Sequence, residues 1–388
     1  MNIVEINYNH PNETFIQRHV DSLISSGYKP ILVARHSDKK LSKLASIGNN
    51  KLGVEIMPNF DRMRLREKIY SLRYLHTNPE KIKIRAKIRD RVLLSYFTSL
   101  KPSLIHFHFG SLAVMMDWIP KSLGIPYTIS LRGSDVQVKP LTSPDYIDKL
   151  RDSILGAAGV HSVCDSLWRE ACNICQIDTE IIYQRTIYTT VPIIDSPKEV
   201  SDSKGYKPYH FVSIGRFHWR KAFDNLLIGF RHYLNHDNNA KLTIIGDGPE
   251  REALLYWVRD LHLGDKVTLT GKLPYKEFSK ILMDCNALIQ SSIAEGFSNV
   301  TAEAMGMSVP VFATDVGGTS EIIIDGENGF LLDPHNPQDW WEKLKLVQDE
   351  VLMKIIGVKA WETARLVFSA EQHAEEFIKF YSGVFDEI

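Results

Sequence analysis

The feature that most constrains the fold is an alternation of short apolar, strand-like runs with helical stretches, which occurs twice along the 388 residues. The first series predicts strands at 3–8, 30–34, 104–107, 127–131 and 159–163. The second predicts strands at 209–214, 241–245, 266–270, 287–290, 309–313 and 329–332. Helical patterns lie between them, at 15–25, 112–123, 222–235, 250–261, 299–305, 339–351 and 370–385. Strands separated by helices need crossover connections, so we expect parallel sheets covered on both faces.

A stretch rich in Pro, Ser, Asp and Lys at 192–208 separates the two series, and we interpret it as a linker. The prediction is a first domain at 1–191 and a second at 209–365, which agrees with about 150 residues per domain. Residues 366–388 are expected to form a terminal helix that packs back on the first domain. Ligands of parallel sheets bind beyond the carboxyl ends of the strands, so we expect the chemistry in the loops that follow strands.

Composition is that of a soluble globular protein, with 44% hydrophobic and 24% charged residues. Four cysteines are too few for a disulfide framework, and we expect Cys172 and Cys175 to be core residues rather than a metal or redox pair. The N-terminal segment lacks the pattern of a signal peptide, and no apolar run approaches the ~18 residues of a membrane span. We therefore expect a cytoplasmic protein.

The window 61–101 is strongly basic, with 12 Lys and Arg against 4 Asp and Glu, although the whole chain has a formal charge of −1. Apolar residues are interleaved with the basic ones, which is typical of amphipathic helices on an anionic membrane surface. A solvated helix face is the competing interpretation. Nucleic acid is a weaker one, because the window contains no recognisable binding module. We predict a membrane-surface partner and no nucleic acid.

The segment 287–305 combines a strand, a loop of small residues and a helix start at Ser298 or Asn299. Free N–H groups at the helix start, with the unhindered Gly296 before them, form an anion-binding cradle. Glu295 precedes the helix and Glu303 lies inside it. The helix dipole alone partly explains two acids at this end, so the segment by itself leaves both interpretations open.

A loop with several cations follows the first strand of the second series. Arg216 comes directly after Gly215, and Lys221 lies at the next helix start. A bidentate arginine and a point-charge lysine are what a diphosphate requires. Each cation alone would be an ordinary surface residue. Their position after a strand favours a phosphate site.

Four motifs in 209–333 resemble the donor domain of the family-4 retaining glycosyltransferases. They are a Glu-x7-Glu pair (Glu295, Glu303), a Gly-Arg loop with a following Lys, a Gly-Asp-Gly-Pro turn at 246–249, and Gly317-Gly318 ahead of Glu321. The resemblance implies an α/β chain with the GT-B fold, in which two Rossmann-like parallel-sheet domains face a central cleft. The first domain would bind the acceptor and the second the nucleotide-sugar.

The resemblance also implies roles for single residues. Arg216 and Lys221 would stabilise the diphosphate as the leaving group, Glu295 would bind the transferred sugar, and Glu303 would bind the ribose. Further donor-site residues would be Gly215, Gly296, Phe297, Ser298, Asn299, Val300, Lys272 and Leu273. One departure is Ala222, because relatives commonly have glycine after the lysine.

The first half resembles members that build bacterial surface polysaccharides. Glu13 and Thr14 fall in a first-loop motif, and His106-Phe107-His108 resembles a strand-end segment. We take the two histidines to point to opposite faces and expect His108 to reach the cleft as a catalytic residue; the alternative is a hydrogen-bonded structural histidine. Arg132 stands where many relatives have histidine, and an arginine cannot act as a general base. With Asp135 it is expected to line the cleft or bind the acceptor.

These features predict a retaining glycosyltransferase that uses no metal and no cofactor. Its co-substrate would be a nucleotide-sugar, with UDP preferred and GDP or ADP possible. Its acceptor would be a glycan, expected to be lipid-linked, in the synthesis of O-antigen, capsule or exopolysaccharide at the cytoplasmic face of the inner membrane. Two alternatives stay open: a nucleotide-sugar epimerase of the same fold, which needs no acceptor, and a non-catalytic sugar-nucleotide-binding protein.

Overall fold

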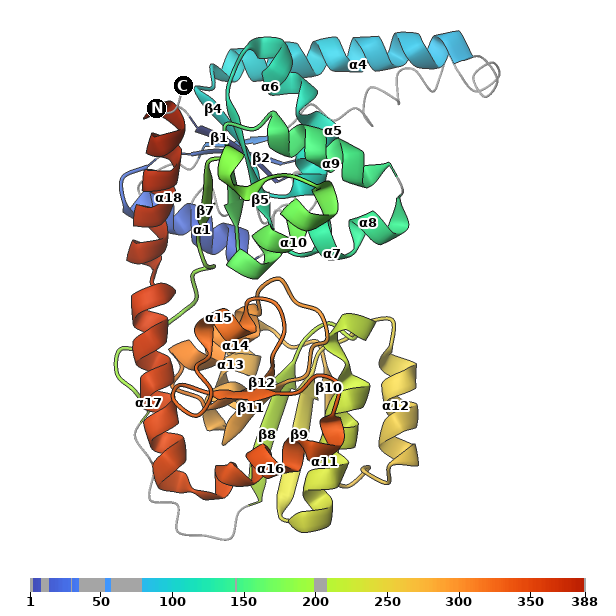
Figure 1. The fold of residues 1–388 in the computed structure, drawn as a ribbon, viewed down its shortest axis with the longest axis vertical. Helices are drawn as coiled ribbons and strands as arrows, with labels where there is room; N and C mark the ends of the chain where they lie inside the picture. The colour runs from blue at the N-terminus through green and yellow to red at the C-terminus, as the bar shows by residue number, and fades with distance from the viewer. Residues whose placement is uncertain are drawn as a thin grey trace. The chain divides into compact units, whose positions relative to one another are not determined.

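The computed structural model describes residues 3–7, 14–28, 30–34, 53–56, 79–143, 145–198 and 208–386. The chain forms two compact units, which are described one at a time (Figure 1). Unit 1 contains Met1–Ser162, Trp168–Ile187 and Ala374–Ile388, and unit 2 contains Val163–Leu167 and Tyr188–His373. No helix of the described ranges combines the length and apolar character needed to cross a bilayer.

Unit 1 is built on a parallel sheet with the strand order β3-β2-β1-β4-β5-β6-β7. Its strands are β1 (Ile3–Asn7), β2 (Ile31–Ala34), β3 (Gly53–Ile56), β4 (Leu104–Phe107), β5 (Tyr127–Leu131), β6 (Gly159–Ser162) and β7 (Gln184–Thr186). The order reverses between β1 and β4, which pair in register from Ile3 with Leu104 to Ile6 with Phe107. Crevices of this fold class form at such a reversal.

Helices follow the strands of unit 1 in the connections between them. They are α1 (Thr14–Ser25), α4 (Pro79–Leu100), α5 (Gly110–Met116), α6 (Trp118–Leu123), α7 (Ser134–Gln137), α8 (Lys139–Thr142), α9 (Tyr146–Leu155) and α10 (Asp165–Cys175), with a 3-10 turn at Thr179–Ile181. The first residues of α10, up to Leu167, are counted with unit 2. The last helix of the chain, α18 (Ala370–Asp386), lies beside α1 in Figure 1. Phe377 and Phe380 of α18 share a buried cluster with Ile3, Leu23 and Leu104, so the terminal helix completes the core of unit 1.

Unit 2 repeats the same topology with the order β10-β9-β8-β11-β12-β13, again all parallel. Its strands are β8 (Tyr209–Ile214), β9 (Ala240–Ile245), β10 (Val267–Gly271), β11 (Ala287–Gln290), β12 (Val311–Thr314) and β13 (Phe330–Leu332). The reversal falls between β8 and β11, which pair at Phe211 with Ala287 and at Val212 with Leu288. Loops that follow these two strands are therefore neighbours.

Alternate residues of the unit 2 strands enter two separate cores. Phe211, on one face, packs in a cluster with Phe230 of α11, whereas Val212, on the other face, packs with Met305 of α14 and Ala360 of α17. The helices are α11 (Phe223–His236), α12 (Arg251–Asp260), α13 (Tyr275–Asp284), α14 (Asn299–Gly306), α15 (Thr319–Ile322), α16 (Trp341–Leu344) and α17 (Glu350–Val367), with 3-10 turns at Trp219–Lys221, Pro337–Trp340 and Lys345–Gln348.

The prediction of one helix at 339–351 is wrong. A 3-10 turn, the short α16 and a second 3-10 turn occupy most of it, and α17 begins at Glu350 because the Asp349 side chain accepts a hydrogen bond from the Leu352 N–H at 2.9 Å. The helix predicted at 112–123 is divided at Asp117 into α5 and α6. Strands β3 and β7 were not predicted, since β7 is a short polar edge strand without an apolar pattern.

The linker predicted at 192–208 lies only partly within the described residues, because 199–207 fall outside them. Its first part packs on unit 2, where the Ile194 N–H donates to the Gly306 carbonyl at 3.0 Å. The chain passes into unit 2 before this stretch, between Ile187 and Tyr188. Cys172 and Cys175 are buried free thiols on α10, which confirms that they are core residues.

Candidate functional site

The loops after β8 and β11 meet at the reversal of strand order in unit 2. Two hydrogen bonds join them: the Ser291 hydroxyl donates to the Lys221 carbonyl at 2.7 Å, and the Ile293 N–H donates to the Arg220 carbonyl at 2.8 Å. The parallel pairing of the two strands brings the predicted cation loop and the predicted acid loop together. This is the position at which ligands bind in doubly wound sheets.

Glu295 and Lys221 form an ion pair across these loops, through Glu295 Oε1 and Lys221 Nζ. The same carboxylate oxygen accepts hydrogen bonds from Gln290 Nε2 and Ser292 Oγ, both at 3.3 Å. The exposed fraction of Glu295 is 8%, so its orientation is fixed by its neighbours rather than by solvent. Gln290 and Ser292 were not predicted as site residues, although their place at the end of β11 was a signal for them.

Arg216 is exposed, and among the described residues no ion pair involves it. Its loop is supported by the Gly-Asp-Gly-Pro turn. A Cβ at Gly246 would lie 1.8 Å from the Gly215 carbonyl oxygen, and one at Gly248 would lie 2.3 Å from the Phe217 carbonyl oxygen. The two glycines are therefore needed because the backbones of the loops touch. These backbone contacts hold the loop that carries Arg216 in place.

Ala222 has φ +42° and ψ +51°, in the left-handed region that L-residues avoid. It ends the short 3-10 turn Trp219–Lys221 and precedes α11. This conformation favours glycine, which is the residue that relatives commonly have here. Alanine at this position therefore strains the backbone. The backbone nevertheless places Lys221 at Glu295.

Helix α14 begins as predicted, with Ser298 as its N-cap accepting the Thr301 N–H at 3.3 Å. Asn299 and Val300 form its first turn and are half-buried, as is Phe297 ahead of it. Glu303 lies inside the helix with an exposed fraction of 5%. The two acids of the Glu-x7-Glu motif therefore lie on either side of the N-terminus of one helix.

Gly317 and Gly318 pack directly on the Glu295–Gly296 backbone. Gly317 has φ +54°, and a Cβ there would lie 1.8 Å from the Glu295 carbonyl oxygen. The Gly318 N–H donates to the Gly296 carbonyl at 2.9 Å. Since a side chain at either position would push this loop aside, the Gly-Gly motif supports the Glu295 loop.

Lys272 and Leu273 follow β10, the edge strand of the unit 2 sheet. Lys272 is exposed, and Leu273 is half-buried against the core that contains α14. Their loop is connected to the other loops indirectly, because the Gly246 N–H donates to the Gly271 carbonyl at 3.0 Å and the Gly246 turn supports Gly215. The carboxyl ends of β10, β9 and β8 thus carry a continuous row of loops.

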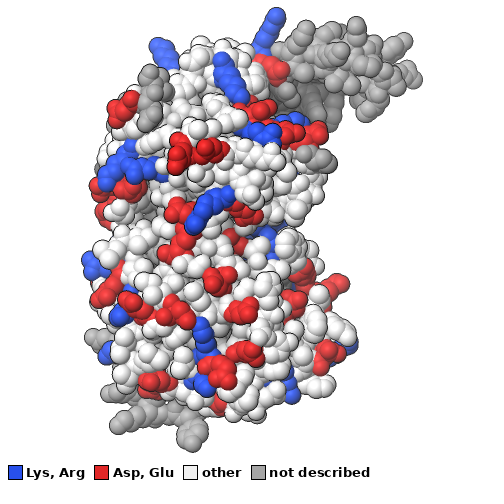
Figure 2. Space-filling view, viewed as in Figure 1, with Lys and Arg blue, Asp and Glu red and all other residues white. Residues whose placement is uncertain are grey.

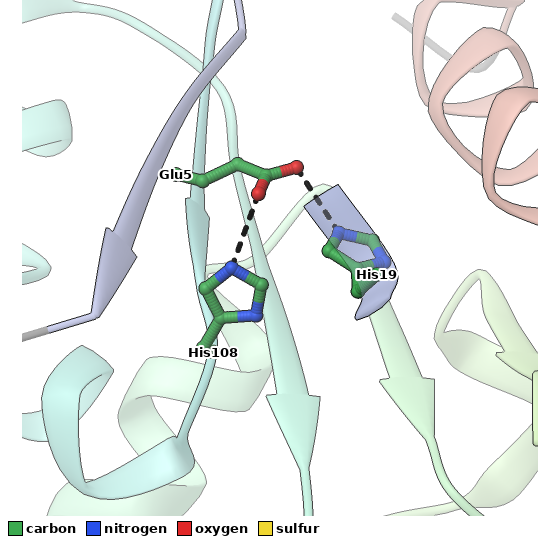
Figure 3. Close-up of side chains that lie close together, drawn as sticks. All are labelled: Glu5, His19 and His108. Atoms are coloured by element: carbon green, nitrogen blue, oxygen red, sulfur yellow. Dashed lines mark hydrogen bonds and ion pairs between the residues drawn. The ribbon is translucent and has the colours of Figure 1, made fainter. Parts of the chain in front are cut away.

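In unit 1 the reversal between β1 and β4 contains a buried cluster of Glu5, His19 and His108 (Figure 3). His19 Nε2 lies 3.1 Å from Glu5 Oε1, and His108 Nε2 lies 3.2 Å from Glu5 Oε2. Tyr381 of α18 donates its hydroxyl to Glu5 Oε1 at 3.2 Å. Glu5 is thus the centre of a hydrogen-bonded network that ties β1, β4, α1 and the terminal helix together.

The expectation for His108 needs correction. Residues two apart on a strand share a face, and the His106 and His108 ring centroids lie 4.9 Å apart on the same side of the sheet. Both rings are 0% exposed. Burial lowers the pKa of His108 to about 4, so this ring is a neutral donor to Glu5. The structure therefore favours the hydrogen-bonded structural histidine.

Burial alone would raise the pKa of Glu5, but the nearby His19 and the hydrogen bonds from both histidines hold it well below its usual value. An ionised carboxylate with two imidazoles, whose ligand atoms lie within 4.8 Å of one another, is also a ligand set that a zinc ion accepts. Hydrogen bonds among the same atoms account for the arrangement without an ion.

Arg132 follows β5 and is held by its neighbours. Its Nε donates to the His108 carbonyl at 3.1 Å, and its guanidinium lies 4.8 Å from the centre of the Phe15 ring. Asp135 is 0% exposed and accepts the Ser111 N–H at 3.2 Å. The prediction that its side chain lines a cleft is wrong, because the carboxylate is buried and anchors the start of α5. Thr14 is exposed at the start of α1, and Glu13 lies outside the described residues.

Residues 61–78 of the basic window lie outside the described residues, and in the rest of the window the side chains are described only from 90 onward. Helix α4 covers its second half, and Leu93 and Phe97 of this helix are buried. On the face shown in Figure 2, basic and acidic side chains of the described residues are interspersed. The membrane partner therefore stays a prediction.

Comparison with known proteins agrees with this geometry. Residues 197–357 match the family model "Glycosyl transferases group 1". An uncharacterised glycosyltransferase of Methanocaldococcus jannaschii is 30% identical over 286 residues, covering 73% of this chain and 76% of that protein. A putative teichuronic acid biosynthesis glycosyltransferase, TuaC of Bacillus subtilis, is 26% identical over 74% of this chain and 72% of its own length.

Solved structures share the fold along the whole chain. Anabaena HepE in complex with UDP superposes with a TM-score of 0.78 at 16% identity, covering 99% of this chain and 100% of that one. TarM superposes with a TM-score of 0.75 at 16% identity, covering 98% of both chains. Two parallel α/β sheets with a repeated strand order and this similarity confirm the predicted GT-B fold. The chain belongs to the group 1 glycosyltransferases.

Proposed function

We propose that this protein is a retaining glycosyltransferase that moves a sugar from a nucleotide-sugar, preferably a UDP-sugar, to a lipid-linked glycan acceptor in surface polysaccharide synthesis. The observation that carries the proposal is the Lys221–Glu295 pair at the reversal of the unit 2 sheet, with the exposed Arg216 on the same loop as Lys221. The two cations Arg216 and Lys221 match the diphosphate of such a donor. The fixed, nearly buried carboxylate of Glu295 matches the hydroxyls of its sugar.

In the proposed mechanism, Arg216 and Lys221 bind the diphosphate and stabilise the charge that develops as it leaves. Glu295 accepts hydrogen bonds from the hydroxyls of the transferred sugar, and Glu303 from those of the ribose. The acceptor hydroxyl attacks the face from which the diphosphate departs, and a phosphate oxygen takes its proton. Two cations and the N–H groups at the start of α14 take the place of a metal ion.

The relatives support the substrate classes in this proposal. They include a Bacillus anthracis N-acetyl-α-D-glucosaminyl L-malate synthase and a Campylobacter jejuni N-acetylgalactosaminyltransferase named for a diphospho-undecaprenol saccharide. Neighbouring structures contain UDP or UDP-glucose. By analogy we propose a lipid-linked acceptor reached from the cytoplasmic face of the inner membrane, with the basic window 61–101 against anionic lipid.

The test is transfer from UDP-, GDP- and ADP-sugars, chosen first by thermal stabilisation, to lipid-linked saccharides. Arg216→Ala and Glu295→Ala are each expected to lower kcat/KM at least 100-fold, because each removes a contact of the donor, while circular dichroism stays unchanged. Arg259→Ala and Glu327→Ala alter exposed residues of the same unit and serve as matched controls.

Near-normal transfer by either site variant would refute the assignment of roles. Donor turnover without any acceptor would indicate an epimerase, and tight donor binding without transfer to any saccharide would indicate a sensor. Nuclear magnetic resonance of the product distinguishes a retained from an inverted anomeric configuration.

A further inference from the structure

Three donors from distant parts of the chain converge on the carboxylate of Glu321, which lies on α15. The Asp165 N–H donates to it at 2.9 Å, the Ser166 N–H at 2.6 Å and the Tyr188 hydroxyl at 3.1 Å. These donors precede Glu321 by 156, 155 and 133 residues, and all belong to unit 2. Hydrogen bonds to an ionised carboxylate are about twice as strong as neutral ones. Glu321 therefore anchors both segments firmly.

The anchored segments also contact the loop that follows Glu295. Cys164, next to Asp165, donates its thiol to the Gly296 carbonyl at 2.9 Å. The Tyr188 ring packs on the Phe297 ring, with centroids 5.5 Å apart. Together with the N–H of Gly318, which directly precedes α15, these contacts hold Gly296 and Phe297 through three separate segments of the chain.

Both side-chain donors keep their protons over the physiological range. Burial raises the pKa of Cys164 to about 11. Burial, followed by the charge of Glu321, raises the pKa of Tyr188 as well. A neutral thiol and a neutral phenol remain hydrogen-bond donors, so Cys164 and Tyr188 can both donate near neutral pH.

We propose that Glu321 is a positioning residue for the donor sugar. Its carboxylate fixes Tyr188 and the segment 164–166, and these hold Gly296 and Phe297 so that Glu295 meets the sugar hydroxyls. Glu321 does not itself touch the substrate. The inference rests on the proposed function, because it takes Glu295 as the sugar contact.

The network predicts that the sugar and the nucleotide depend on Glu321 to different extents. The loop around Gly296 contacts the sugar end of the donor in the proposed function, whereas Arg216 lies on the loop after β8, which is supported by Gly246 and Gly248 instead. Removing the Glu321 carboxylate leaves two backbone N–H groups without their acceptor, so their segment shifts to find another one. We expect the shift to reach Gly296 and to leave Arg216 in place.

Isothermal titration calorimetry on the full chain tests this. The ligands are UDP-glucose, GDP-mannose or ADP-glucose, whichever binds the wild type, and the matching nucleoside diphosphate. Glu321→Ala is expected to weaken nucleotide-sugar binding at least tenfold and diphosphate binding less than threefold. Glu321→Gln keeps one acceptor oxygen, so its affinity for the nucleotide-sugar should lie between those of the wild type and Glu321→Ala. Glu327→Gln, which alters an exposed carboxylate 3.5 Å from Lys359, is the matched control and should change neither.

If Glu321→Ala weakens the binding of the nucleotide-sugar and of the diphosphate by the same factor, or changes neither, the inference is overturned and Glu321 has a structural role only. If Glu321→Ala does not fold, Cys164→Ala and Cys164→Ser replace it: the serine keeps a donor for the Gly296 carbonyl and should preserve the ratio that alanine loses. Absence of binding by the wild type to all three nucleotide-sugars would instead count against the proposed function, and with it the inference.

Discussion

At the scale of single residues, the unit 2 site is held in place before any ligand arrives. Glu295 is contacted by Lys221, Gln290 and Ser292 through one carboxylate oxygen. A side chain fixed in this way loses little rotamer entropy on binding a ligand, which favours the sugar contact proposed for Glu295. In the proposed function, a bound diphosphate would compete with Glu295 for the Lys221 ammonium, and the sugar would compete with Lys221 for the Glu295 carboxylate.

Ala222 provides a test at this scale. Ala222→Val places a β-branched residue at φ +42°, and we expect it to lower the free energy of unfolding by about 2 kcal/mol or more. Ala222→Gly relieves a left-handed backbone that costs an L-residue about 1–2 kcal/mol. It also removes a buried methyl group worth about 0.8 kcal/mol and frees the unfolded chain, so we expect a net change within about 1 kcal/mol. Urea unfolding followed by circular dichroism measures both. A valine variant as stable as the wild type would show that residue 222 does not adopt the left-handed conformation.

Sequence reasoning predicted which loops of unit 2 lie together, because its signals are local. Arg216, Lys221 and Glu295 each follow a strand, and parallel pairing alone brings such positions together. It failed for His108 and Asp135, because whether a polar side chain at a strand end faces solvent or the interior depends on the elements packed over it. In unit 1 those elements include α18, which is more than 200 residues away in the sequence.

At the scale of elements, α18 is the least local part of the fold. Its Phe377 ring packs on His19 at 4.3 Å and on His161 at 4.7 Å between centroids, and its Tyr381 reaches Glu5. The helix itself was predictable from its apolar period, at 370–385 against the observed Ala370–Asp386. The division of 339–351 was not predictable in this way, since its 3-10 turns follow from the packing of Trp340 and Val347 on unit 2.

Tyr381→Phe measures how much the contact with Glu5 stabilises unit 1. The substitution keeps the ring and removes one hydrogen bond to a buried ionised carboxylate, so we expect the free energy of unfolding to fall by about 1.5–3 kcal/mol. Tyr256→Phe is the matched control, because its hydroxyl lies 3.5 Å from Asp260 on an exposed face and should contribute less than about 0.5 kcal/mol. Equal effects of the two variants in thermal unfolding would contradict the importance of the Glu5 network.

At the scale of the whole molecule, the same strand order occurs in both units. In each unit a cluster of interacting polar side chains lies where the order reverses: Glu5, His19 and His108 in unit 1, and Lys221 and Glu295 in unit 2. The chain changes unit between Ser162 and Val163, again before Trp168, after Ile187 and after His373. The linker predicted from composition accounts for only one of these crossings between the two units. The chain passes more than once for two reasons. The segment 163–167 packs in unit 2, although the residues on both sides of it belong to unit 1. The terminal helix packs in unit 1, although the residues before it belong to unit 2.

The proposed membrane contact belongs to this scale, since it depends on the charge of a whole window. Reversing Arg85, Lys87, Arg89 and Arg91 to Glu should weaken binding to anionic vesicles at least tenfold, because each basic residue near such a surface contributes about 1 kcal/mol. Reversing the exposed Lys149, Lys276, Lys280 and Lys354 gives the same net charge and serves as the control. Sedimentation with vesicles of phosphatidylglycerol measures both. Equal loss in the two variants would leave the window a solvated helix face.

The packing of α18 on unit 1 has a consequence for the order in which the protein can mature on the ribosome. Ile3, Leu23 and Leu104 are synthesised early, but their cluster lacks Phe377 and Phe380 until the last residues of α18 emerge from the exit tunnel. The half that is translated first therefore finishes folding last, after unit 2 has been made. Until then its apolar surface is exposed, which makes the nascent chain a natural client for chaperones.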